Sequence, residues 1–308
     1  MSGVFLCVGD LDVDLLVDVD RLPGLDDKVS GRRLGLGVGG MAANVAVGLA
    51  RLGSTARLVA LVGDDDHGRF ACRELARAGV DTRFIHPLAD TPTFMCMVML
   101  THSGEKALVR LETDAYLPAV HQVTADCLAD VRHVHLTLGS IDLSRHCLAL
   151  ARTVGASVSL DLEQADLPGD PREVLDLLGR LDWLFLNHRS YEHLRGALER
   201  PRLATLARRV IVTLGAAGCR REGLRRGEDI RIPGFPVTVR DSTGAGDAFA
   251  AAFLHYHLSA GLDEAEALRH ANAAAALSVG ALGAQAGLAD AQAVAAFLAH
   301  PPEPPEEH

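Results

Sequence analysis

The sequence predicts an α/β fold built on a mainly parallel sheet, and three observations lead to that prediction. First, Val4–Val8 is a short and continuous apolar run, which is typical of a strand buried on both faces. Second, strand-like runs alternate with helix-length segments from His133 onward, which indicates successive βα units. Third, a glycine-rich loop at 241–246 leads into the apolar segment Ala248–Leu258, and this order predicts a loop that opens a buried helix.

Each expected element has its own pattern. Continuous apolar runs predict strands, and apolar residues at helical spacing predict helices. Phe94–Leu100 and Leu108–Leu111, joined by a polar turn at 102–105, predict a hairpin. The other strands are expected at Val4–Val8, Leu15–Val19, Thr55–Val62, His133–Leu136, Ser157–Leu160, Trp183–Leu186 and Val210–Leu214. Helices are expected at Met41–Leu52, Phe70–Ala78, near 142–153, 171–180 and 190–209, and at Ala248–Ala260 and Glu264–Gly280.

Composition and charge narrow the classes of function. The 308 residues are 48% hydrophobic and only 4% aromatic, so we expect a core of Ala, Leu and Val. The net charge of −10 argues against a nucleic-acid partner, because a polyphosphate backbone requires a basic face. No apolar run is both long enough and helical enough to span a bilayer, which argues against a membrane protein.

The six cysteines are scattered along the chain, and no Cys-x-x-Cys pair occurs among them. Because no signal peptide is recognisable either, we expect reduced and mostly buried thiols and a cytoplasmic location. Cys219 stands in a loop-like stretch, so it is the one candidate for a reactive thiol.

The most informative stretch is Asp241–Phe249, where polar residues and glycines precede the expected helix. The first N–H groups of a helix have no internal partner, and the helix dipole adds partial positive charge there. Gly244 and Gly246 carry no side chain that would keep an anion away, so the stretch predicts an anion site. Asp247 would repel that anion, and a chemical reason to keep it is to take a proton from an alcohol that attacks phosphorus. The alternative is an Asp that merely complements the helix dipole.

Three alternating aspartates, Asp10, Asp12 and Asp14, follow the first strand. Ligands of open α/β sheets bind outside the carboxyl ends of the strands, so these carboxylates are placed to accept hydrogen bonds from hydroxyl groups. A polar turn that leads into the next strand explains the same spacing equally well.

Gly35–Gly40 fits Gly-x-Gly-x-x-Gly, the dinucleotide fingerprint, and acidic residues at 64–66 follow in the expected place. This pattern would indicate a nicotinamide-dependent dehydrogenase. The fingerprint should follow a buried apolar strand, however, and Ser30–Leu34 is not such a strand.

Two motifs near the two ends of the chain resemble the ribokinase-like (PfkB-type) carbohydrate kinases. Asp241–Asp247 (DSTGAGD) is similar to the C-terminal signature of that family, and Gly39–Asn44 (GGMAAN) is similar to its N-terminal signature. The resemblance covers about residues 4–298. Because both signatures occur in one chain in the expected order, we favour this interpretation over the dinucleotide fingerprint.

The resemblance implies an architecture as well. It predicts a single domain over residues 1–308, with a three-layer α/β/α part on a mainly parallel sheet. A small β-sheet lid would be formed by about 14–38 and 88–113. Residues 301–308 are rich in Pro and Glu, so we expect a disordered tail there.

The resemblance also implies roles for individual residues. In the family the Gly-Ala-Gly amides hold the transferred phosphate and the next Asp is the base, which here correspond to Gly244, Ala245, Gly246 and Asp247. Sugar contacts match Asp12, Asp14, Gly39, Gly40 and Asn44. Contacts to the nucleotide and its phosphates match Asn187, Thr213, Gly215, Gly218, Asn272 and Gly283. A monovalent cation such as K⁺, which some members hold through oxygens, would meet Asp241, Thr243 and Ala284.

The chain departs from the family pattern in two places. Ribokinase itself has Lys where Met41 stands, which weakens a ribose assignment. The family motif Asn-x-x-Glu, whose Glu helps to organise Mg²⁺ and phosphate, is present only as Asn187 with Ser190 in the place of the Glu. Glu192 is the nearest acid in the sequence.

We therefore predict an ATP- and Mg²⁺-dependent kinase that phosphorylates a primary hydroxyl of a sugar or sugar-like molecule. No Gly-x-x-x-x-Gly-Lys-[Ser/Thr] sequence occurs, which excludes a P-loop kinase. Lids of the family often pair, so a homodimer through the lid is expected. A nucleoside kinase on the same fold is the principal alternative, and a nicotinamide-dependent dehydrogenase and a catalytically silent sugar sensor are two others.

Overall fold

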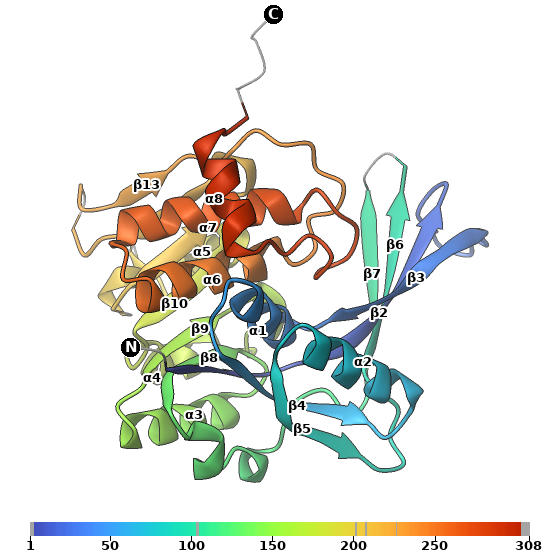
Figure 1. The fold of residues 1–308 in the computed structure, drawn as a ribbon, viewed down its shortest axis with the longest axis horizontal. Coiled ribbons are helices and arrows are strands. Elements are labelled where there is room, and N and C mark those ends of the chain that lie inside the picture. The colour runs from blue at the N-terminus through green and yellow to red at the C-terminus, as the bar shows by residue number, and fades with distance from the viewer. Residues whose placement is uncertain (1–2, 103–104, 201, 207, 226, 303–308) are drawn as a thin grey trace, which may run out of the picture.

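The computed structural model describes residues 3–102, 105–200, 202–206, 208–225 and 227–302. Its larger part has three layers, with helices on both sides of a central sheet (Figure 1). Within these residues nine strands pair in the order β13-β12-β11-β10-β9-β8-β1-β4-β5. Their bounds are β1 Val4–Val8, β4 Ala56–Gly63, β5 Asp81–Leu88, β8 Val131–Thr137, β9 Ser157–Asp161, β10 Trp183–Asn187, β11 Val210–Thr213, β12 Cys219–Glu222 and β13 Ile230–Ile232.

The central sheet is mainly parallel, as the sequence predicts. Neighbouring strands run parallel from β5 across to β11, and β12 and β13 extend one edge with antiparallel pairs. Every residue of β1 and β4 is buried, because helices cover both faces of the sheet. The carboxyl ends of the parallel strands therefore meet at one edge, where the candidate site lies.

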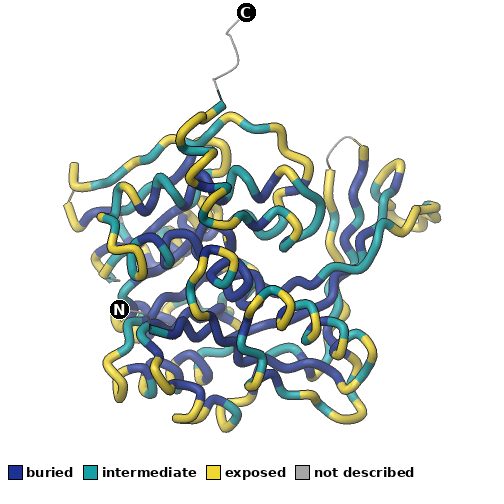
Figure 2. Tube along the Cα trace, viewed as in Figure 1, coloured by how far each residue is buried: buried dark blue, intermediate teal, exposed yellow. Residues whose placement is uncertain are grey.

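The helices divide into two layers. They are α1 Met41–Arg51, α2 Asp66–Arg77, α3 Ile141–Thr153, α4 Leu175–Leu178, α5 His188–Ala197, α6 Ala245–Leu254, α7 Glu264–Ser278 and α8 Ala291–Ala299. Phe5 and Cys7 of β1 belong to the core that also contains residues of α1, α2, α6, α7 and α8, whereas Leu6 and Val8 belong to the core that contains residues of α3, α4 and α5. This alternation of side chains places two buried cores on opposite faces of the sheet, visible as the dark interior of Figure 2.

A second, smaller sheet stands beside the first, at the right of Figure 1. Its strand order is β3-β2-β6-β7, with β2 Asp12–Val19, β3 Gly31–Gly39, β6 Met95–Thr101 and β7 Lys106–Leu111. We call these four strands the lid sheet. The predicted hairpin is confirmed as the antiparallel pair of β6 and β7, and residues 103–104 of its turn lie outside the described residues. Gly35–Gly39 are part of strand β3 and not of a loop, so the dinucleotide-fingerprint interpretation is wrong.

Two expected helices are shorter than predicted. The segment near 190–209 contains α5, which ends at Ala197, and a separate 3₁₀ turn at Leu203–Thr205. Glu199 has a φ of 52°, a left-handed conformation that cannot continue a helix. The segment near 171–180 is a 3₁₀ turn at Pro171–Val174 followed by the short helix α4.

Other expectations concern the cysteines, the tail and membranes. Cys219 is buried, and burial raises the pKa of its thiol to about 12, so the expectation of a reactive thiol is wrong. Most of the expected disordered tail, residues 303–308, lies outside the described residues. Across the described ranges, no helix has both the length and the apolar character that a bilayer crossing requires.

Helices α1 and α6 pack closely, and this contact brings residues of the candidate site together. A Cβ added at Gly48 of α1 would lie 2.7 Å from Cβ of Ala251 in α6, so only a glycine allows this approach. One turn before Gly48, the side chain of Asn44 reaches Asp247 of α6. The two motifs that flank these helices in the sequence therefore meet in space.

Candidate active site

A cavity of about 470 Å³ opens at the carboxyl edge of the central sheet, where the lid sheet also contributes to its wall. Asp161, Asn187 and Thr213 line it from the last residues of β9, β10 and β11. Asp12 and Asp14 line it from β2 of the lid sheet. Polar groups that follow several different strands are therefore gathered in one place, as expected for a ligand site of an open α/β sheet.

A second cavity of about 570 Å³ adjoins the first. It is lined by Gly215, Gly218 and Asn272 among others, and its wall is more apolar than that of the first cavity. The two cavities share Thr213, Ser242, Gly246 and Phe249 as lining residues. They therefore meet at the start of helix α6.

The start of α6 offers unpaired N–H groups. Gly244 is the N-cap residue, has a left-handed φ of 76°, and provides no side chain to cap the helix. In the part of the chain that the structure describes, the N–H groups of Gly244 and Gly246 have no hydrogen-bond partner, whereas that of Ala245 donates weakly to Ser242 O at 3.3 Å. An anion at this end would meet both these donors and the positive end of the helix dipole.

The start of α1 is different, because Asp10 already caps it. The N–H groups of Met41 and Ala42 donate to the Asp10 carboxylate at 3.0 and 3.2 Å. Gly40 has a φ of 96° and lies against the backbone of Asp10, where a Cβ would come within 2.6 Å of the carbonyl oxygen. Gly40 thus allows the turn from the lid sheet into α1, and α6 is the helix whose N-terminus stays open toward the cavity.

Asp247 lies in the first turn of α6 with only 6% of its surface exposed, and it lines the first cavity. Asn44 Nδ2 donates to its Oδ2 at 2.7 Å. Burial, reinforced by the neighbouring Asp161, raises the pKa of Asp247 well above its ordinary value. A buried carboxylate with a raised pKa is suited to accept a proton near neutral pH.

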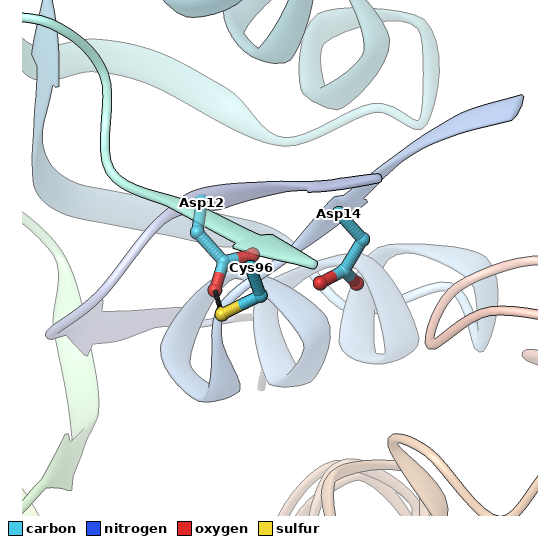
Figure 3. A group of neighbouring side chains, drawn as sticks. All are labelled: Asp12, Asp14 and Cys96. Atoms are coloured by element: carbon cyan, nitrogen blue, oxygen red, sulfur yellow. Dashed lines mark hydrogen bonds between the residues drawn. The ribbon is translucent and has the colours of Figure 1, made fainter. Parts of the chain in front are cut away.

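Asp12 and Asp14 project from β2 beside Cys96 of β6, as Figure 3 shows. The Cys96 thiol donates to Asp12 Oδ2 at 3.4 Å, and Asp12 Oδ1 is buried with no hydrogen-bond partner among the described residues. A Cβ at Gly39 would lie 2.1 Å from Asp12 Oδ1 and 2.7 Å from Asp14 Oδ2, so the glycine leaves room for both carboxylates. The unpartnered oxygen is a position at which a donor from a ligand would be favourable.

Burial also affects the protonation of these lid carboxylates. It raises the pKa of Asp14 to about 6, with Asp241 adding to the effect. It raises the pKa of Asp12 well above its usual range, and the neighbouring Asp14 adds to this. Both groups therefore change charge more easily near neutral pH than an exposed Asp would.

Three further acids line the first cavity, and none of them was identified from the sequence. Asp161 ends β9, and Glu163 and Asp166 follow it in the next turn. Burial, with Glu163 adding to it, raises the pKa of Asp161 to about 8 and that of Asp166 to about 6. The rule that pointed to Asp12 and Asp14, polar residues just after a strand, would have found them.

Two cations face these acids from the lid sheet. Lys106 and Arg110 lie four residues apart on β7, so their side chains emerge on the same face, and both line the first cavity. Arg110 stands over the ring of Tyr116 at 4.7 Å and 3.7 Å from Asp166. Arg32 on β3 of the same sheet is largely exposed and pairs with Asp18 at 2.9 Å instead.

The family resemblance matched several residues to nucleotide and cation contacts, and these residues do not all lie in one cavity. Gly215, Gly218 and Asn272 line the second cavity, and Asn187 lines the first. The Gly283 N–H donates to Asp241 Oδ2 at 2.9 Å. Asp241 also accepts hydrogen bonds from Thr243, and these outweigh its burial and lower the pKa of its carboxyl. Ala284 lies beside Gly244 and lines the first cavity.

Comparison with known proteins decides the family. The family model described as pfkB family carbohydrate kinase matches residues 5–291. The chain belongs to this family. An ATP-dependent ribose-1-phosphate kinase from Halopiger xanaduensis is 35% identical over 95% of this chain and 97% of its own. A nucleoside kinase from Methanothermobacter thermautotrophicus is 31% identical over 96% and 95% of the two chains. The solved ribokinase of Arabidopsis thaliana, complexed with ribose and ATP, matches 97% of this chain and 99% of its own at 26% identity, with a TM-score of 0.80.

The carbohydrate kinase departs from the family motif at Ser190, as the sequence indicates. Ser190 stands in that place, is buried, and accepts a hydrogen bond from the Gln164 N–H at 3.0 Å. Glu192 is on the surface of α5, pairs with Arg195 at 2.6 Å, and does not line the cavity, so it is not the substitute. Asn187 caps α5 by accepting from the Ser190 N–H at 2.8 Å. Seven acids line the cavity together with Asn187, and Glu163 is the glutamate among them.

We predict that Asp247→Asn lowers turnover of the kinase by at least about a hundredfold, the usual size of a general-base effect. The fold should not suffer, because Asn can still accept from Asn44. Burial raises the pKa of Asp247 above its unfolded value, so its contribution to stability is full below the unfolded pKa and is lost as pH rises through the folded pKa. The neutral Asn should therefore leave the melting temperature at pH 8 equal or higher. Kinetics and thermal unfolding of the same preparation measure both, and near-normal turnover would remove Asp247 from the chemistry.

A pair of glycine variants should separate folding from anion binding. In Gly244→Ala the Cβ would lie 2.7 Å from Ala284 O at a left-handed position, so we expect the free energy of unfolding to fall by roughly 1–2 kcal/mol. In Gly246→Ala the Cβ meets nothing within 4 Å, and Ala is the better helix former, so stability should be equal or higher. The added methyl group would stand beside the open N–H groups, so the KM for ATP should rise or turnover should fall. Chemical denaturation and steady-state kinetics measure the two effects, and unchanged kinetics of Gly246→Ala would contradict an anion site there.

Proposed function

We propose that this kinase transfers the γ-phosphoryl group of ATP to a primary hydroxyl of a sugar or sugar-like acceptor. The observation that carries the proposal is the junction of the two cavities at the start of α6. An acceptor in the first cavity and a nucleotide in the second would meet at Asp247 and at the open N–H groups of Gly244 and Gly246. Phosphoryl transfer requires mainly positioning and stabilisation of charge, and this junction offers both.

The acceptor is oriented by the lid sheet and by the start of α1. Asp12 Oδ1 and the carboxylate of Asp14 accept hydrogen bonds from hydroxyl groups, and the unpartnered Asp12 Oδ1 gains the donor that it lacks. Gly39 leaves room for these two carboxylates, and Gly39 and Gly40 both line the cavity that would hold the acceptor. Asn44, between Gly40 and Asp247, lies where it can contact the same hydroxyl group as the base.

The chemical step follows from the position of Asp247. Asp247 takes the proton of the attacking hydroxyl while the hydroxyl oxygen bonds to the γ-phosphorus of ATP. The bond from that phosphorus to the bridging oxygen breaks, and ADP leaves with the electron pair. The Gly244, Ala245 and Gly246 amides stabilise the negative charge on the phosphoryl group during transfer.

The nucleotide occupies the second cavity. Its apolar wall suits a base and a ribose. Thr213, Gly215, Gly218 and Asn272 line it, and Gly283 lies in the loop after α7. The solved ribokinase with ATP supports a nucleotide site on this fold. Oxygen ligands suit Mg²⁺, and Glu163 with Asn187 would hold it, where it neutralises phosphate charge.

A phosphorylated sugar is the second candidate acceptor. Lys106 and Arg110 face the cavity together, and they are the groups that would bind an acceptor phosphate. The relative named ATP-dependent ribose-1-phosphate kinase supports this candidate. The seven carboxylates that line the same cavity, Asp10, Asp12, Asp14, Asp161, Glu163, Asp166 and Asp247, favour a neutral acceptor instead. A nucleoside acceptor is supported by the archaeal nucleoside kinase and by Phe94 and Tyr116, whose rings line the cavity 4.9 Å apart.

A screen of ADP release should identify the acceptor class. Hexoses, pentoses, ribose 1-phosphate, keto-deoxy acids and nucleosides would be tested with Mg-ATP. If the acceptor carries a phosphate, Arg110→Met should raise its KM by roughly tenfold or more, the effect of losing one hydrogen bond to a charged group. Arg32→Met, which changes an exposed cation of the same sheet, is the matched control. If the acceptor is neutral, its KM should be similar in Arg110→Met and Arg32→Met. If no acceptor causes ADP release, the silent sugar sensor is favoured.

We further propose that two lid sheets pair in a homodimer. Val109 and Leu111 on the edge strand β7 are each 45% exposed, an unusual exposure for apolar side chains on a free strand edge. Pairing with a second copy would cover them. A bound K⁺ at Asp241, Thr243 and Ala284 and a cytoplasmic location both stay predictions. Lys106 Nζ already lies 2.8 Å from Thr243 Oγ1, which places another cation close to that candidate K⁺ site.

Light scattering should then give a particle mass of about twice the 32.7 kDa of one chain. Val109→Glu places a charge in the paired surface and should shift the protein to single chains. Val154→Glu, at a similarly exposed apolar position after α3, should leave the mass unchanged. A single-chain mass for the unaltered protein would refute the dimer.

A further inference from the structure

A chain of two hydrogen bonds links the loop after helix α7 to Asp247. Gln285 Nε2 donates to Asn44 Oδ1 at 3.0 Å, and Asn44 Nδ2 donates to Asp247 Oδ2 at 2.7 Å. Asn44 and Asp247 are buried, and Gln285 is partly buried. Three segments that are far apart in the sequence thus act on one carboxylate.

The orientation of the Asn44 amide decides what this chain does. The amide can present its NH₂ group to Asp247 or, after a half turn, its carbonyl oxygen. The NH₂ group stabilises the ionised carboxylate, whereas the carbonyl oxygen can accept only from the protonated acid. Because Gln285 donates to Asn44 Oδ1, it favours the orientation with the NH₂ group toward Asp247.

Gln285 is itself held in place by its neighbours in the loop. The Gly283 N–H donates to Asp241 Oδ2 at 2.9 Å. The carbonyl of Ala284 packs against Gly244, where an added Cβ would come within 2.7 Å. The backbone on the N-terminal side of Gln285 is therefore fixed against the start of α6, and the Gln285 side chain extends from a defined position.

We propose that Gln285 is a positioning residue for the proton-accepting step, acting on Asp247 through the amide of Asn44. The inference rests on the proposed role of Asp247 as the base. Gln285 acts without touching the reacting atoms, because it determines which face of the Asn44 amide meets the carboxylate.

The charges around Asp247 make this orientation important. Asp161 at the end of β9, Asp10 after β1 and Glu163 all face it and oppose its ionisation, in addition to its burial. The cations Lys106 and Arg110 enter the same cavity from β7. Among the side chains, Asn44 provides the hydrogen bond that favours the ionised form of Asp247.

Gln285→Met and Gln285→Glu test the proposal through the pH dependence of kcat/KM. Met keeps the size of the side chain but removes the donor. An ionised Glu would accept from the Asn44 NH₂ group and so turn the carbonyl oxygen toward Asp247. In Gln285→Met we expect the apparent pKa of the acid limb of kcat/KM to rise by about one pH unit. This rise corresponds to an about tenfold loss of kcat/KM at low pH, which is the size of losing one hydrogen bond to a charged group. The shift should be larger in Gln285→Glu, and activity at high pH should change little.

The control is Gln292→Ala, on the exposed surface of α8, which should leave the profile unchanged. If Gln285 only held the loop in place, both variants would change the KM for ATP without moving the acid limb. An acid limb that stays in place in both variants therefore overturns the proposal.

A second measurement does not depend on turnover. The difference in melting temperature between the protein and its Asp247→Asn variant, followed against pH, reports the titration of Asp247. The midpoint of this difference should move to higher pH in the Gln285→Met background, and an unchanged midpoint overturns the role of Gln285. Absence of turnover with every acceptor, by contrast, would count against the proposed function and not against this hydrogen-bond chain.

Discussion

The contact between helices α1 and α6 is the constraint on which the site depends. Gly48 lets the helices approach until its α-carbon faces the methyl group of Ala251, and Asn44 then reaches Asp247 at 2.7 Å. The same contact buries the carboxylate, because Asp247 sits in the first turn of a helix that is apolar along its length. Open N–H groups and a buried acid are thus side by side at one helix end. Burial opposes the charge of a carboxylate, so a buried Asp in the first turn would be unfavourable if this helix had only a structural role.

Several of the carboxyl groups that line the cavity are buried. Asp12, Asp161 and Asp247 are all buried, and burial raises the pKa of each of them. Such groups weaken the fold at neutral pH, and hydrogen-bond donors or cations from a ligand would offset the effect. The site is therefore suited to ligands that bring hydroxyl groups or a metal ion, while the N–H groups of α6 and the cations Lys106 and Arg110 are suited to phosphate.

Sequence reasoning was accurate where a local motif carries its own geometry. The stretch Asp241–Asp247 predicted a glycine-rich loop that opens a buried helix, and the structure has that loop and helix. It left open which acid replaces the family's Glu, and the nearest acid in the sequence, Glu192, lies on the surface of α5, where it pairs with Arg195. It also missed Glu163, which follows a strand as Asp12 does but belongs to no recognised motif. The length of α5 depended on a left-handed Glu199, which no propensity indicates for that residue.

The sequence by itself determined the parallel sheet, the hairpin of the lid sheet, the kinase signatures and the acids after the first strand. These features are local, because apolar periodicity and glycine placement act within a few residues. Only the tertiary structure decided that Asn44 meets Asp247, that Gln285 meets Asn44, and that Arg110 rather than Arg32 faces the cavity. Those contacts join residues far apart in the chain, and their partners depend on how closely helices pack and which face of a strand turns inward, which no short stretch of sequence specifies.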